Sequence, residues 1–249
     1  YLSSRAYKCV PGDALEVAEA GDFDRGQPFS CGVWTKISKT DVAGSVVARM
    51  DDQNGFRGWD LWVENGRVGS HIVHKWQEDS LKVMSKSPVK PDQWNHILVT
   101  CDGTGKAAGV KVYVNGVPQE TNAPIDSLKS TFLTKVPLKV AQRHTTSRLN
   151  DILLEDLRIY SRALSAKEAA QLVKATRTAS LASKPADRRT REEVSELYDG
   201  WLASVDLPHQ DLASKVSRLE EEQSAIKGRS TLAHVMAEPF PNGTGLDLG

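Results

Sequence analysis

The chain has 249 residues, of which 39% are hydrophobic and 26% are charged. This composition argues against wholesale disorder, and the length fits one large all-β sandwich or a sandwich with a small accessory unit. The 32 basic and 32 acidic residues balance, which makes nucleic acid a poor candidate partner. No apolar run approaches the roughly 20 residues that span a bilayer, so we expect no membrane span.

Residues 23–160 show the period-two alternation of hydrophobic residues that is typical of β-strands. In segment 29–37 the two faces separate as Phe29, Cys31, Val33 and Ile37 against Ser30, Trp34 and Lys36. Asn65-Gly66 and Asn115-Gly116 lie between alternating runs and supply the positive φ angles of tight hairpin turns. Further strand candidates are residues 45–50, 94–101, 137–142 and 151–160. Many short strands without helices between them predict an antiparallel sandwich or jelly roll.

Helical signals begin only after residue 160. Ser165 and Glu168 have the spacing of a capping box, which predicts a short helix. Residues 177–188 are rich in small residues and contain Pro185, a composition that predicts a linker.

Residues 189–230 predict a helical hairpin, and residues 231–249 an extended tail. Thr190 and Glu193 repeat the capping spacing. Two apolar stripes follow, separated by Leu207-Pro208: Val194, Leu197, Tyr198, Trp201, Leu202 and Val205, then Leu212, Val216, Leu219 and Ile226. Because the stripes are sparse, we expect two antiparallel helices that are stabilised by packing Trp201 and Leu202 against the other helix or the sandwich.

Two sequence segments resemble a known family. In residues 93–119 a Trp-x-His opens a strand, and a Tyr-Val-Asn-Gly hairpin follows an Asp-Gly turn. This resembles the laminin-G-like, concanavalin-A-like jelly roll, and residues 154–172 resemble that family's closing strand and short helix. The resemblance covers roughly residues 23–173 and implies a jelly-roll domain over 1–176, in a mainly β protein with the C-terminal α-helical hairpin.

A narrower resemblance concerns residues 23–37, 48–76, 142–149 and 230–240. They resemble the laminin-G-like insert of large exported planctomycete proteins, which often accompanies a c-type cytochrome domain. This implies a periplasmic or extracellular location, with neighbouring domains of the same parent protein as partners. The chain contains neither partner domain and departs from the family pattern after Pro239.

The acidic residues argue against an enzyme. A retaining glycosidase needs two carboxylates about 5 to 5.5 Å apart. Glu155 and Asp156 are adjacent and point to opposite faces, whereas Asp151 and Glu155 lie about 13 Å apart along a strand. We expect one of the adjacent pair to bind a polar neighbour such as Arg158. A glycoside hydrolase remains the less favoured alternative.

Aromatic and polar residues suitable for binding a sugar gather in a few segments. Sugars stack on aromatic rings while planar polar side chains bind their hydroxyls. The candidate ligand-binding residues are Arg57, Trp59, Asp60, His71, Trp76, Arg143 and His144. Trp59 shares parity with Leu61 and therefore also fits the core, whereas Trp76 lies in a predicted loop and is the better exposed candidate.

Metal and cysteine signals are weak. Asp51, Asp52 and Asn54 supply oxygen donors for calcium, although an ordinary turn has the same residues. No other cofactor is expected.

Cys31 and Cys101 lie in predicted strands, where a thiol acts as a small core hydrophobe; a disulfide between them is the alternative.

These patterns favour a non-catalytic recognition module within a larger exported protein, with a polysaccharide or glycan as its ligand. The alternative from another class is a structural scaffold that positions a neighbouring domain without binding a glycan. An exposed Trp76 beside a polar surface would favour the first, and burial of the same residues the second.

Overall fold

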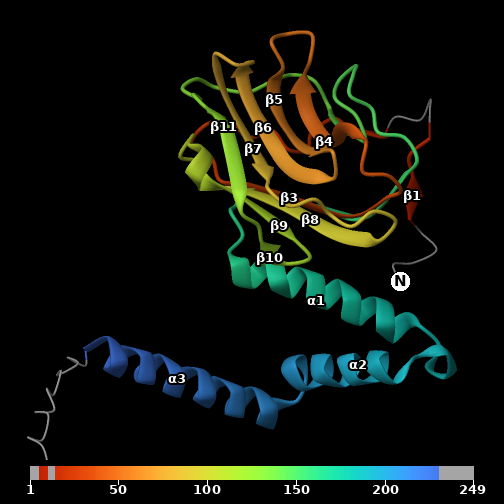
Figure 1. Ribbon diagram of the computed structural model, residues 1–249, viewed down its shortest axis with the longest axis vertical. Helices are drawn as coiled ribbons and strands as arrows, with labels where there is room; N and C mark the ends of the chain where they lie inside the picture. Colours follow the sequence, from red (N-terminus) through yellow and green to blue (C-terminus); the bar gives the residue numbers. More distant parts are fainter. Residues whose placement is uncertain (1–5, 11–14, 230–249) are drawn as a thin grey trace, which may run out of the picture. The chain divides into compact units, whose positions relative to one another are not determined.

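The computed structural model describes residues 6–10 and 15–229, and its main body is a sandwich of two antiparallel sheets (Figure 1). The six-stranded sheet runs in the order β1 (Tyr7–Lys8), β13 (Ile152–Tyr160), β3 (Phe29–Ile37), β8 (Trp94–Cys101), β9 (Val110–Val114) and β10 (Val117–Pro118). The seven-stranded sheet runs β11 (Thr121–Asp126), β7 (Asp79–Ser85), β6 (Arg67–Lys75), β5 (Arg57–Glu64), β4 (Ala43–Asp51), β12 (Leu138–Val140) and β2 (Leu15–Val17). The predicted mainly β sandwich is confirmed.

The core fills the space between the two sheets because alternate residues of each strand point inward. Phe29, Cys31 and Val33 of β3 meet Trp59 and Leu61 of β5 in one continuous apolar cluster. The intervening residues of these strands, including Trp34 and Asp60, lie on the outer faces. The predicted alternation is therefore confirmed, and it leaves two outer faces available for function.

Both predicted hairpin turns are present. Asn65 and Gly66 have φ angles of 50° and 71°, and Asn115 and Gly116 have 51° and 79°. These positive φ angles suit the right-handed twist of the flanking strands, so each turn fixes the register of its hairpin.

Three strands of the seven-stranded sheet, β2, β7 and β11, are not among the sequence candidates. Strands β7 and β11 carry polar residues that interrupt a clear alternation, and β2 and β11 are the two edge strands. All three cysteines are buried, Cys31 and Cys101 are free thiols, and burial raises the pKa of Cys31 to about 12. Cys31 lies opposite Val99, and Cys101 opposite Phe29, so the alternative disulfide is not formed.

Helix α1 (Ala166–Ser183) begins with the predicted capping box, since Ser165 and Glu168 bind each other's backbone. The linker predicted over 177–188 is wrong for most of its length, because α1 continues to Ser183 and a short 3-10 turn covers Ala186–Arg188. Small residues are compatible with a helix when one face is buried, and Leu181 is buried here. The helix ends just before Pro185, which disfavours helical geometry in the residue preceding it.

Helices α2 (Arg191–Ser204) and α3 (Leu207–Arg229) follow, and α2 has the predicted reciprocal cap between Thr190 and Glu193. The chain divides into two compact units, with the boundary after Leu197. Helix α3 has no buried residue along its described length, and Trp201 is 45% exposed. The described residues of α3 thus do not form the packed stripe that a hairpin requires, because a stripe this sparse buries too little area to hold two helices together.

The predicted tail over 231–249 lies outside the described residues. None of the described helices is long and apolar enough to cross a bilayer.

Candidate functional site

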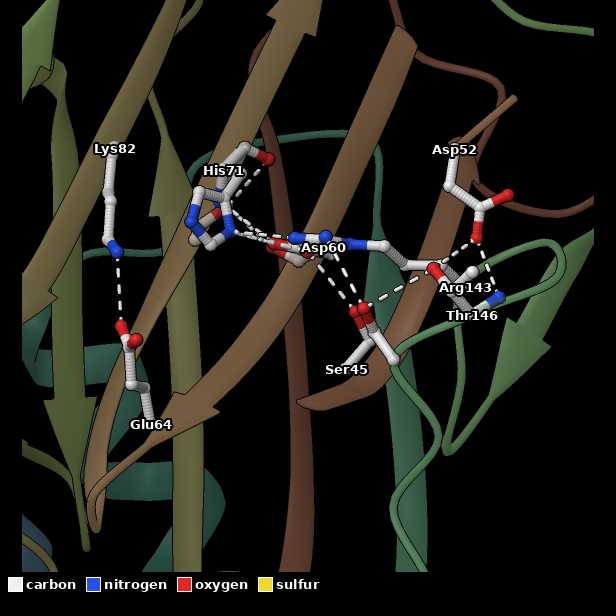
Figure 2. Close-up of polar contacts among 10 residues, drawn as sticks. Ser45, Asp52, Asp60, Glu64, His71, Lys82, Arg143 and Thr146 are labelled. Atoms are coloured by element: carbon white, nitrogen blue, oxygen red, sulfur yellow. Dashed lines mark hydrogen bonds and ion pairs between the residues drawn. The ribbon is translucent and has the colours of Figure 1, made fainter. Parts of the chain in front are cut away.

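Three of the predicted site residues meet on the outer face of the seven-stranded sheet: Asp60, His71 and Arg143 (Figure 2). Asp60 of β5 lies directly opposite His71 of β6 in the strand register. Arg143 comes from the loop after β12 and reaches Asp60 across 83 positions of sequence. We call these three residues, together with Ser45, the ionic cluster.

The carboxylate of Asp60 is the centre of the ionic cluster. Its Oδ2 accepts hydrogen bonds from Nε and Nη2 of Arg143, at 3.0 and 2.8 Å, and from the hydroxyl of Ser45 at 3.1 Å. Its Oδ1 accepts from the backbone N–H of His71 at 2.9 Å and lies 3.0 Å from the ring Nδ1 of the same residue. Both carboxylate oxygens are therefore satisfied by the chain itself.

Burial and charge act in opposite directions on Asp60. The residue is 1% exposed, and burial alone would raise its pKa. The charges of His71 and Arg143, with the hydrogen bonds from His71, outweigh burial and hold the pKa of Asp60 below its ordinary range. The carboxylate consequently stays ionised at neutral pH and has no proton to donate, which suits an anchor rather than a general acid.

Aromatic rings enclose the ionic cluster. The guanidinium of Arg143 lies 4.3 Å from the ring centre of Trp62 and 5.3 Å from that of Phe56, distances at which a cation is attracted to a ring face. The ring of His71 meets those of Trp62 and Trp76 edge-on, each at 5.2 Å. Parity on β5 places Trp62 beside Asp60, but sequence alone did not show that Phe56 joins them.

Trp76 is only partly exposed, which corrects the expectation of a freely exposed loop residue. Its ring lies 6.3 Å from that of Phe56, and both rings pack on a small apolar cluster that includes Met50 and Val73. The turn after β6 folds Trp76 back toward the sheet because this apolar surface is available to cover. One part of the indole stays open to solvent at the edge of the ionic cluster.

The remaining candidates lie elsewhere. Trp59 is buried in the core, where its indole N–H donates to the carbonyl of Gly21 at 2.8 Å, so it does not reach a ligand. Arg57 is partly buried, with Nη2 3.5 Å from Nε2 of His74. The backbone N–H of His144 donates to the carbonyl of Met50. The structure therefore joins Asp60, His71, Trp76 and Arg143, and leaves Trp59 out.

The oxygens proposed for calcium have other roles. Asp52 accepts hydrogen bonds from the backbone N–H and the hydroxyl of both Thr145 and Thr146, at 2.5 to 3.2 Å. These bonds lower its pKa, although burial opposes them. Asp51 accepts from the backbone N–H of Gln53. Asp52 thus holds the loop that carries Arg143. Its carboxylate oxygens are surrounded by N–H and O–H donors, an arrangement that is poorly suited to binding a cation.

On β13 the carboxylate of Asp156 binds neighbouring polar side chains. A register irregularity separates Glu155 from Arg158, and Asp156 in it has a positive φ angle of 54°. Asp156 pairs with Nε of Arg158 at 2.7 Å, as predicted, and also accepts from the hydroxyl of Thr176 in α1 at 3.0 Å. Among the described residues no three His, Cys, Asp or Glu side chains gather as a metal site.

Comparisons with solved structures show the same fold in binding domains. A Ruminococcus gnavus sialidase carbohydrate-binding domain bound to α2,3-sialyllactose is 14% identical, with a TM-score of 0.53, and the match covers 68% of this chain and 96% of that one. The botulinum neurotoxin serotype D ligand-binding domain in complex with N-acetylneuraminic acid is 16% identical, with a TM-score of 0.52 and coverages of 71% and 46%. The binding domain of Paraclostridial mosquitocidal protein 1 is 17% identical, with a TM-score of 0.51 and coverages of 66% and 41%.

The chain therefore spans less than half of either toxin domain, and identities this low show the fold alone. No curated protein sequence matches the chain. A family model described as the concanavalin A-like lectin/glucanases superfamily, of laminin-G type, matches residues 11–170. Since this match covers well over half of the sequence, the chain belongs to the laminin-G-type branch of the concanavalin A-like lectin/glucanase superfamily.

Proposed function

We propose that the chain is a non-catalytic recognition module that binds a carbohydrate within a larger exported protein. The observation that carries this proposal is the partly exposed ring of Trp76 at the edge of the ionic cluster. The C–H face of a sugar stacks on the open part of this ring, and nearby polar side chains bind the hydroxyls. The sialidase domain bound to α2,3-sialyllactose and the serotype D toxin domain in complex with N-acetylneuraminic acid support this class of ligand.

The ionic cluster contributes by keeping this surface rigid. Arg143 and Asp52 hold the loop at 143–146 against the sheet from two sides. The loop and the ring of Trp76 are therefore ordered before a ligand arrives, and a preorganised surface loses less entropy on binding.

The test is retention of the chain on a panel of neutral and acidic polysaccharide gels. Trp76→Ala should weaken retention about tenfold, since a stacked ring contributes roughly 0.5 to 1.5 kcal/mol beyond area burial. Trp76→Phe should keep most of the binding, and Trp201→Ala, which removes an exposed indole in the other compact unit, is the matched control. Failure of the wild-type chain to be retained on any gel would refute the proposal.

A structural scaffold is the second candidate function, and the exposed apolar residues of the C-terminal helices favour it. Leu212, Leu219 and Ile226 of α3 are all more than half exposed, which is unusual for large aliphatic side chains in such a row. A neighbouring domain of a parent protein would cover them. Under this alternative, Leu212→Asp with Leu219→Asp should abolish association with the flanking domains and leave glycan retention unchanged.

A further inference from the structure

A concave site lies on the opposite side of the sandwich from Trp76, between α1 and the outer face of the six-stranded sheet. It is a cleft of about 320 Å³, near the lower end of the range for small-molecule sites. Its lining comes from β3, from the start of β8 with the preceding turn, and from the C-terminal half of α1: Trp34, Lys36, Asp92, Gln93, Trp94, Arg177, Ser180 and Leu181. All these residues belong to the first compact unit.

Two tryptophans supply the aromatic walls of the cleft. Trp34 and Lys36 lie on one face of β3, and Lys36 is directly opposite Trp94 of β8. The two indoles are therefore diagonal neighbours on the same face of adjacent strands, within reach of each other's edges. Trp34 is 6% exposed, whereas Trp94 is more open. One ring thus forms the base of the cleft and the other its rim.

One cleft-lining residue, Trp34, has a buried polar atom that the chain leaves unsatisfied. The indole N–H of Trp34 is buried and has no hydrogen-bond partner among the residues that the structure describes. Buried donors in native proteins are almost always paired, with water or a ligand where the chain supplies nothing.

The charges around the cleft balance. Nζ of Lys36 lies 2.9 Å from Oδ1 of Asp92, and Nε of Arg177 pairs with Glu196 of α2. Each cation is matched by a carboxylate, so the rim offers both donors and acceptors with no excess of either sign. This disfavours phosphate and other strongly charged ligands and suits a polyhydroxylated neutral one.

We propose that this cleft is a binding site for a neutral pyranose sugar, stacked on Trp94 and hydrogen-bonded by the rim. The site is separate from the surface at Trp76 and does not depend on it. The small volume selects a chain end or one or two rings rather than a long polysaccharide lying across a face.

The experiment uses the full chain and a panel of neutral mono- and disaccharides, followed by saturation-transfer NMR and by quenching of tryptophan fluorescence. Trp94→Ala should weaken the binding of the responding sugar at least tenfold. Ser180→Phe should do the same by filling the cleft from α1 while both tryptophans remain. Asp92→Asn removes the negative charge from the rim of the cleft without straining the backbone, because Asn tolerates the positive φ of 53° at this position. Trp76→Ala is the control and should leave this binding unchanged.

The outcomes separate this site from the surface at Trp76. Loss of binding in Trp94→Ala and Ser180→Phe, with both variants showing wild-type melting curves, supports the cleft. Binding that is lost in Trp76→Ala and kept in Trp94→Ala overturns the cleft and leaves the proposed function standing. The absence of any sugar response also overturns it.

Discussion

Replacing His96 by Phe should remove one specific component of the protein's pH-dependent stability. His96 of β8 is 4% exposed and lies opposite Trp34, whose ring it meets edge-on at 5.4 Å. Its Nδ1 has no hydrogen-bond partner among the described residues. Burial lowers the pKa of His96 from 6.5 to about 4, so the ring stays neutral in the folded protein well below neutral pH.

The direction in which stability changes with pH follows from which state of the protein binds the proton. Between the unfolded pKa of 6.5 and the folded pKa of about 4, the unfolded chain takes up a proton that the folded protein does not. The free energy of unfolding therefore falls as the pH is lowered through this window, and it levels off below the folded value. Between about pH 7.5 and about pH 4.5 this single histidine should cost about 2.5 kcal/mol of stability.

Urea denaturation at the two pH values measures the effect as a difference between proteins. Carboxylates contribute equally to the pH-dependent stability of wild type and variant. The free energy of unfolding of His96→Phe should therefore fall by about 2.5 kcal/mol less than that of wild type over the same pH interval. His96→Gln, which also cannot titrate, should show the same reduced pH dependence even if its stability at neutral pH is lower. Equal losses in wild type and both variants would refute the assignment of a buried neutral histidine.

Three further predictions concern the rest of the molecule. Arg143→Met should lower the free energy of unfolding by about 3 to 5 kcal/mol, because it leaves Asp60 charged and buried; combining it with Asp60→Leu should recover part of the loss in urea melts, and no recovery would contradict the pairing. Trp201→Ala should change stability by less than about 1 kcal/mol, since a ring that is 45% exposed leaves no large cavity, and a loss of several kcal/mol would show that it is buried in solution. A chelator should leave the melting temperature unchanged, because Asp52 is bound to hydroxyl and N–H donors; a lowered melting temperature would restore the calcium site.

The sandwich was predictable because its signals are local. Period-two alternation, the Asn-Gly turns and the capping residues each act over a few positions, and the structure has strands, hairpins and caps where they indicate. Where the sequence-based prediction differs from the structure, the cause is tertiary packing. Helix α1 extends to Ser183 and buries Leu181, and no local pattern around residue 181 contains that information.

The candidate site was predictable only in part. Parity places Asp60 and Trp62 on the same face of β5, and cross-strand register adds His71. The position of Arg143 depends on a loop that folds back over the sheet and is held there by Asp52. The cleft was missed for the same reason, because Trp34 and Trp94 become a site only when α1 packs beside them.

The pairing of Arg143 with Asp60 limits how the outer face of the seven-stranded sheet can bind a ligand. Redirecting Arg143 to a ligand would leave a buried carboxylate without its partner, at a cost of several kcal/mol. A ligand on this face should therefore stack on Trp76 and leave the pair between Arg143 and Asp60 intact. The surface at Trp76 should consequently tolerate many sugars that present an apolar face.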